Sequence, residues 1–67
     1  MNELPPRPNL RPVEIAKFLD LSLTKIYGMI SEGKLPAFKI DGQYRISRAK
    51  FLAWYEKHQS GQDFLSV

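Results

Sequence analysis

The stretch that decides the fold is EIAKFLDLSLTKIYGMI, residues 14–30. Its apolar residues recur at helical spacing on both sides of a short break, DLS, at residues 20–22. This pattern predicts two helices joined by a three-residue turn, the helix-turn-helix arrangement. Ala16 leaves room for the second helix to cross closely, and Leu19 and Leu21 are expected to fill the angle between the helices. Many helical pairs share this spacing, so the spacing alone is weakly specific. The basic hairpin that follows the pair makes the prediction of a helix-turn-helix more specific.

Residues that start or stop a helix set the limits of the pair. Pro12 suits the first position of the first helix. Ser22 is predicted to cap the second helix, because its hydroxyl can accept a hydrogen bond from a free backbone N–H. Gly33 is expected to end that helix in a left-handed conformation, and Pro36 prevents its continuation.

A third helix is predicted after Ser47, which is a suitable N-cap. Apolar and aromatic side chains form one continuous stripe along it, at positions i, i+3, i+4 and i+7. The residues of this stripe are Phe51, Trp54, Tyr55 and His58. Leu52 lies off the stripe and is expected to be exposed.

Between the second and third helices, residues 38–47 (FKIDGQYRIS) predict a β-hairpin. The dipeptide at residues 41–42, Asp-Gly, is typical of a two-residue turn. Such a turn would place Lys39 opposite Tyr44. Because directly opposed residues share a face, this register mixes basic and apolar side chains.

A three-residue loop at residues 40–42 separates the two kinds of side chain, and we favour this register. It places Phe38 opposite Tyr44 on the face toward the helices, together with Ile46. The outer face then carries Lys39, Gln43 and Arg45. Such a hydrogen-bonding wing is suited to the DNA backbone or minor groove.

The chain ends differ in composition from the predicted domain, which spans residues 10–58. The prolines of residues 1–9 predict a flexible, extended arm. Residues 59–67 form a C-terminal tail whose apolar side chains are Phe64, Leu65 and Val67. Disorder or back-folding of the tail is the favoured interpretation, and contact with a neighbouring monomer or an integrase is the alternative.

Charge points to a polyanionic partner. The net charge is +3, and five cations but one anion occur between residues 34 and 50. Such a stripe suits nucleic acid, although it also describes an ordinary solvated surface. The longest apolar run has five residues, FLAWY, which is too short for a transmembrane helix or a signal peptide. The absence of cysteine excludes disulfides and agrees with a cytoplasmic location.

Catalysis is not predicted. His58 is the only histidine and lies on an apolar stripe, where packing explains it better than proton transfer. The carboxylates are scattered without metal-ligand spacing, and there is no glycine-rich phosphate loop. The sequence therefore predicts no enzyme, no metal and no cofactor.

In a helix-turn-helix unit the N-terminal residues of the second helix meet the bases in the major groove. Tyr27 is ambiguous here, and we expect its ring to join the core while its hydroxyl reaches a phosphate. Gly28 permits close backbone approach, with helix packing as the alternative interpretation. The candidate DNA-binding residues are Ser22, Leu23, Thr24, Lys25, Tyr27, Gly28, Lys39, Gln43, Arg45 and Arg48.

Taken together, residues 10–55 resemble the excisionase-type, MerR-like winged helix-turn-helix family. The pieces that carry the resemblance are EIAKFL.LS, IY..I..GKLPA.KI, G.YRI.R and FLAW. The resemblance implies an α+β fold with the order helix, helix, two-stranded β-wing, helix. It also implies binding of double-stranded DNA by the second helix and the wing. Members include excisionases, which are recombination directionality factors, AlpA-like regulators and phage packaging proteins.

The chain departs from this family in charge. Members often carry arginines at the positions of Leu23, Thr24 and Gly28, and a basic residue at that of Gln43. Because affinity for DNA grows with the number of neutralised phosphates, we expect weak binding by one monomer. The expected function is that of an excisionase-like factor that binds specific DNA in tandem and bends it, with an integrase or recombinase as a candidate partner. A small transcriptional regulator and a protein-interaction module without DNA binding are the alternatives.

Overall fold

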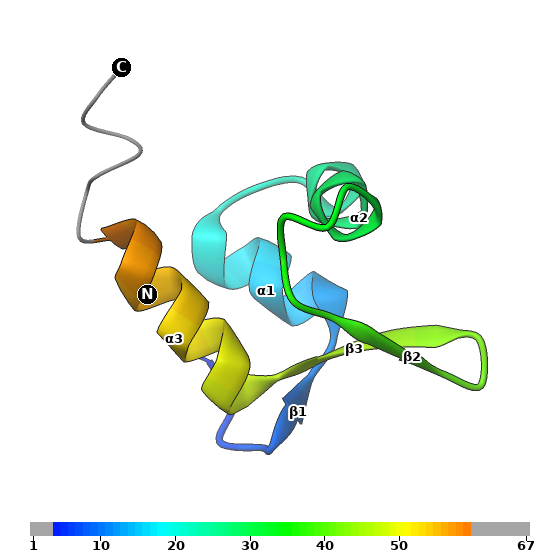
Figure 1. Cartoon of the computed structure of the whole chain (residues 1–67), viewed down its shortest axis with the longest axis horizontal. Coiled ribbons are helices and arrows are strands. Elements are labelled where there is room, and N and C mark those ends of the chain that lie inside the picture. The colour runs from blue at the N-terminus through cyan, green and yellow to red at the C-terminus, as the bar shows by residue number, and fades with distance from the viewer. Residues whose placement is uncertain (1–3, 60–67) are drawn as a thin grey trace.

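The computed structural model describes residues 4–59, which fold into three helices and a three-stranded antiparallel sheet (Figure 1). The elements in chain order are β1 (Asn9–Leu10), α1 (Pro12–Leu19), α2 (Leu23–Ser31), β2 (Phe38–Ile40), β3 (Gln43–Ser47) and α3 (Arg48–Gln59). The predicted α+β winged helix-turn-helix fold is confirmed. Within these residues no helix has the length and apolar character needed to cross a membrane.

The helix limits follow the local signals. α1 begins at Pro12, and the Ser22 hydroxyl accepts a hydrogen bond of 3.1 Å from the Lys25 backbone N–H. Gly33, after the end of α2, has a left-handed φ of 74°. Asp20 ends α1 with a φ of 59°, a conformation that aspartate tolerates better than most residues. The predicted starts and stops of the helix pair are therefore confirmed.

One apolar core joins all the helices to the sheet. Its buried members are Leu10, Ile15, Ala16, Ile26, Leu35, Ile46 and Phe51. The Phe51 ring contacts the rings of Phe18, Trp54 and Tyr55, with centroid distances of 5.7, 5.6 and 6.0 Å. Leu21, which we expected to fill the angle between α1 and α2, is instead 41% exposed.

The N-terminal segment is part of the fold. β1 pairs with β3, with Asn9 opposite Ser47 and Leu10 opposite Ile46. The backbone N–H of Arg48 donates to the Pro8 carbonyl at 2.8 Å. The flexible arm predicted for residues 1–9 is therefore wrong for residues 4–9, because burial of Leu10 and these hydrogen bonds hold the segment against β3 and α3.

The prediction for Leu52 is also wrong. This leucine is half-buried and packs against the core, although it was expected to be exposed. It lies one turn after Arg48, whose side chain bonds to the Pro5 carbonyl. Leu4 packs against the same core, and the Pro5 and Pro8 carbonyls hold the N-terminal segment at the start of α3 through Arg48.

The wing has the two-residue turn and not the favoured three-residue loop. Phe38 lies opposite Arg45, Lys39 opposite Tyr44 and Ile40 opposite Gln43. Asp41 and Gly42 have φ values of 54° and 80°, as a type I′ turn requires.

The favoured register was wrong because no buried face constrains β2. All three residues of this strand are exposed, and Ile40 is 57% exposed. Turn chemistry therefore sets the pairing. Mixing basic and aromatic side chains is also favourable here, since the Lys39 ammonium lies 5.1 Å from the centroid of the Tyr44 ring.

The turn makes Gly42 sensitive to substitution. An added Cβ would meet no atom within 4 Å, so the only strain is that of the backbone at a φ of 80°. We expect Gly42→Ala to lower the free energy of unfolding by about 1–2 kcal/mol. Urea denaturation followed by circular dichroism measures this change, and stability equal to that of the wild type would contradict the two-residue turn.

Candidate nucleic-acid interface

The N-terminal half of α2 presents its polar side chains to solvent. Ile26 is fully buried and fixes the inner face of the helix. Residues 22–25, including the cap, are all exposed. Thr24 and Gly28 lie on the side opposite Ile26, while Lys25 lies about 100° from Ile26 on the flank away from Tyr27, as the period of an α-helix requires. These positions are suited to contact base edges in a major groove.

Gly28 gives this helix face a flat backbone surface. No heavy atom lies within 4 Å of the position that a Cβ would occupy. Packing within residues 4–59 therefore does not require glycine here, and the helix-packing interpretation loses its support. An external surface could approach the backbone closely at this point.

Gly28→Ala is expected to change stability and DNA affinity in opposite directions. Alanine is the better helix former, so we expect the free energy of unfolding to rise by about 1 kcal/mol. If the backbone approaches DNA at Gly28, the new methyl group lowers duplex affinity at the same time. Urea denaturation and fluorescence anisotropy on one preparation measure both quantities, and unchanged affinity would remove Gly28 from the interface.

Tyr27 lies outside the core, contrary to the prediction for its ring. The residue is 43% exposed, because Ile26 occupies the inward position and Tyr27 lies about 100° further round the helix. Its ring centroid is 6.0 Å from that of Tyr44 on β3. With Lys39 above Tyr44, an aromatic contact links α2 to the wing.

A groove of about 370 Å³ lies between the start of α1, α2 and the wing. Its lining residues are Arg11, Pro12, Val13, Tyr27, Gly42, Gln43, Tyr44 and Arg45. β1 pairs only with residues 46 and 47, so this groove lies along the part of β3 that β1 leaves uncovered. It joins the two elements that a winged helix-turn-helix uses on DNA.

Two arginines give the groove its charge. Arg45 donates from Nη1 to the Tyr44 carbonyl at 2.7 Å and from Nη2 to Gln43 Oε1 at 2.9 Å. These bonds hold the guanidinium along the strand. The side chain of Arg11 is 54% exposed, with Nη2 3.5 Å from Glu14 Oε2. Glu14 also pairs with Arg7 and therefore offsets part of this positive charge.

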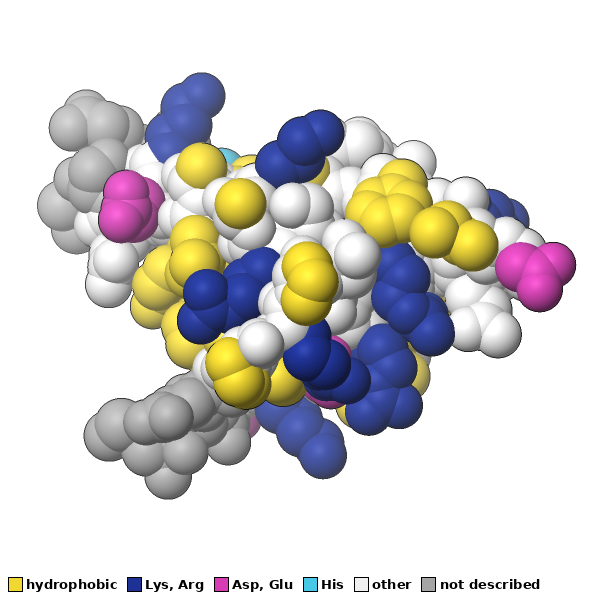
Figure 2. Space-filling model, turned by 90° about the horizontal axis from the view of Figure 1, so that it is seen from below, with side chains coloured by type: hydrophobic (Ala, Val, Ile, Leu, Met, Phe, Trp, Pro, Cys, Tyr) yellow, Lys and Arg dark blue, Asp and Glu magenta, His cyan; other side chains and the backbone are white. Residues whose placement is uncertain are grey.

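The surface charge is unevenly spread. Figure 2 shows Lys and Arg side chains gathered over the middle of the face seen from below, with an acidic side chain at the tip of the wing. The turn residue Asp41 provides a negative charge at this tip. On this face, which is the side away from α2 in Figure 1, the positive side chains therefore lie nearer the base of the wing than its end.

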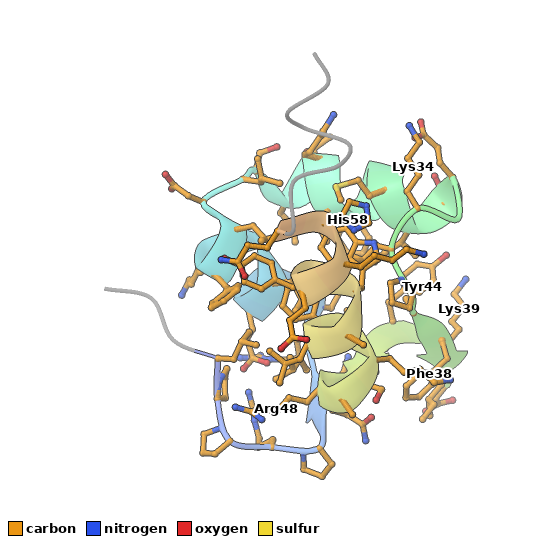
Figure 3. All side chains as sticks on the ribbon, turned by 60° about the vertical axis from the view of Figure 1, so that its left-hand side comes forward. Lys34, Phe38, Lys39, Tyr44, Arg48 and His58 are labelled. Carbon is orange, nitrogen blue, oxygen red and sulfur yellow. The ribbon has the colours of Figure 1, made fainter. Side chains whose placement is uncertain are left out.

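The structure does not bring Arg48 to the other candidate residues. Its Nε donates to the Pro5 carbonyl at 3.1 Å, and the side chain is partly buried. Figure 3 shows Arg48 beside the N-terminal segment, away from Tyr44 and Lys39. One donor of its guanidinium is therefore held by the docked N-terminal segment, and contact of Arg48 with DNA stays a prediction.

Arg11 was missed by the sequence analysis. It lies directly before α1, and the structure brings it into the groove with Tyr27 and Arg45. Its charge and its place before Pro12 were the only signals in the sequence. Its neighbours come from segments far along the chain, which the helix pattern does not reveal.

The paired helices and the projecting wing define the winged helix-turn-helix class of DNA-binding domain. The chain belongs to the helix-turn-helix domain family, whose model matches residues 10–59. This match supports the resemblance to the excisionase-type branch and implies DNA binding; domains of this family are typically not enzymes. No curated protein and no solved structure matched the chain in the corresponding comparisons.

Proposed function

We propose that the protein is an excisionase-like DNA-binding factor that recognises specific double-stranded sites, binds them in tandem and bends the DNA. α2 enters the major groove, and the wing follows the adjacent backbone and minor groove. The observation that carries this proposal is the groove in which Tyr27 of α2 meets Tyr44 and Arg45 of the wing, with Arg11 beside them.

The proposed roles follow from side-chain chemistry. Thr24 and Lys25 contact base edges, and Leu23 meets a thymine methyl group. The polar side chains that contact the backbone are Arg11, Ser22, Tyr27, Lys39, Gln43 and Arg45. Phosphate contacts fix the position of the protein, while the contacts of α2 give sequence preference.

Few cations serve this interface, which supports binding in several copies. The exposed or groove-lining cations near α2 and the wing are Arg11, Lys25, Lys39 and Arg45. The three of these that are proposed to contact phosphates, Arg11, Lys39 and Arg45, correspond to a slope of about −2.7 in a plot of log affinity against log salt concentration. A single module of this size buries roughly 600–1,000 Å² on DNA, so neighbouring copies or an integrase would add the remaining affinity.

Footprinting tests the proposal. Protection of tandem direct repeats at a recombination site, with bending seen by circular permutation, is the expected result. Protection of one promoter operator without bending would identify a small regulator instead. If no duplex is protected at low salt, DNA binding is overturned. The alternative function, a protein-interaction module without DNA binding, would then be supported.

A further inference from the structure

A second groove, of about 490 Å³, lies on the other side of α2, between the α1–α2 turn and α3. Its floor is apolar and includes Leu21, Met29, Trp54 and Tyr55. Lys25 and Lys34 stand among its lining residues, and no lining residue is acidic. Its volume is within the usual range of binding pockets, roughly 300–1,000 Å³.

This groove has a fixed wall. The indole Nε1 of Trp54 donates to the Lys34 carbonyl at 2.7 Å and ties α3 to the segment after α2. The same ring lies 5.6 Å from the Phe51 ring and 4.3 Å from the His58 ring. Figure 3 shows Lys34 and His58 near the C-terminal ends of α2 and α3. The wall is therefore formed before any partner binds.

Among the lining residues of this groove, Lys25 alone also belongs to the proposed DNA interface. Met29 lies two residues after Tyr27 and hence about 200° further round α2. Tyr27 lines the groove on the wing side, and Met29 lines this one. A protein bound to DNA through Tyr27 and the wing would leave most of this surface open.

The apolar floor and the nearby lysine indicate which kind of ligand the groove can bind. The floor is mainly aliphatic and aromatic, and the indole N–H of Trp54 already donates to the Lys34 carbonyl, so the floor suits aliphatic or aromatic side chains better than phosphates. Lys34 Nζ lies 3.2 Å from Glu32 Oε1, and both side chains are highly exposed. Such a surface ion pair contributes little, so a partner's carboxylate can replace Glu32 at small cost.

We propose that this groove docks a segment of a separate partner protein that carries adjacent large apolar residues flanked by carboxylates. The apolar side chains fill the floor beside Leu21 and Trp54. A carboxylate of the partner meets the ammonium group of Lys34, which lines the groove and is not assigned to DNA. Charge complementarity of this kind gives specificity and speeds association.

Trp54 is the only tryptophan and therefore reports occupancy by its fluorescence. The probe is the synthetic peptide Glu-Glu-Leu-Leu-Glu-Glu, titrated into the full chain. We expect a saturable blue shift of the emission. Glu-Glu-Ala-Ala-Glu-Glu tests the apolar requirement, and Lys-Lys-Leu-Leu-Lys-Lys tests the charge; both are expected to give less than a tenth of the affinity.

Two variants locate the binding. Lys34→Gln is expected to weaken binding of the acidic peptide several-fold, and Leu21→Ser is expected to abolish the shift. Lys50→Gln is the matched control for charge, because Lys50 is exposed and does not line the groove. Circular dichroism checks that each variant is folded, which is expected since Leu21 and Lys34 are exposed.

Four results would overturn the proposal. They are a fixed emission maximum at millimolar acidic peptide, an equal response to the basic peptide, a shift caused by raising the protein concentration alone, and the same shift caused by a DNA duplex. The third would identify a second copy as the occupant, and the fourth would identify DNA. Duplex binding measured on the same samples distinguishes failure of this site from failure of the proposed function.

Discussion

Arg45→Ala is expected to lower the affinity of the protein for every DNA duplex by about tenfold. Arg45 supplies one of the two guanidinium groups in the groove between α2 and the wing. A hydrogen bond to a charged group contributes about 1.5–3 kcal/mol, and about 1.4 kcal/mol is a factor of ten. Loss of one phosphate contact also flattens the slope of log affinity against log salt by about 1.

Fluorescence anisotropy over a range of salt concentrations measures both effects. Lys50→Ala removes the same charge from an exposed position outside the groove and is expected to have little effect. Thr24→Ala is a second comparison, because it should change base preference while leaving the salt slope nearly unchanged. Unchanged affinity of Arg45→Ala would show that the wing is not a DNA contact.

Phe51→Ala is expected to remove a large part of the free energy of unfolding. The ring is fully buried and contacts Phe18, Trp54 and Tyr55. Truncation of a buried phenylalanine costs about 3–5 kcal/mol. A chain of this length has a total stability of roughly 3–10 kcal/mol, so the substitution removes a large part of it.

Urea denaturation followed by circular dichroism measures the loss. Ile40→Ala is the control, because this side chain is 57% exposed on the wing. We expect its midpoint to stay close to that of the wild type. A Phe51→Ala variant with a native-like midpoint would contradict the central place of this ring in the core.

The helix pair was predictable because its signals are local. The Ser22 cap, the left-handed Gly33 and the start at Pro12 each depend on a few neighbouring residues. The inward positions of Ile15 and Ile26 follow from helical spacing. These features define the helix-turn-helix without knowledge of the rest of the chain.

The hairpin register was not predictable from its alternating pattern. An alternating pattern determines the register only when one face of the strand is buried, whereas all of residues 38–40 are exposed. The turn preference of Asp41 and Gly42 then decides the pairing. Lys39 consequently lies with Tyr44 and not with Gln43 and Arg45.

The roles of three further residues depend on long-range packing. Arg48 is bound by Pro5, which is 43 residues away in the chain. Arg11 reaches the groove because β1 places the start of α1 beside β3. Tyr27 lies toward the wing because Ile26 takes the core position. Neither composition nor local pattern reveals such contacts. The positions of these side chains therefore follow only from the folded structure.

The most direct test of DNA binding by α2 and the wing is a titration of the full chain with a short duplex at low salt, followed by backbone amide chemical shifts. The predicted result is a set of shifts concentrated at Arg11, residues 22–28 and residues 39–45, with little change at Trp54. Shifts absent from these segments, or no shifts at any duplex concentration, would contradict the account.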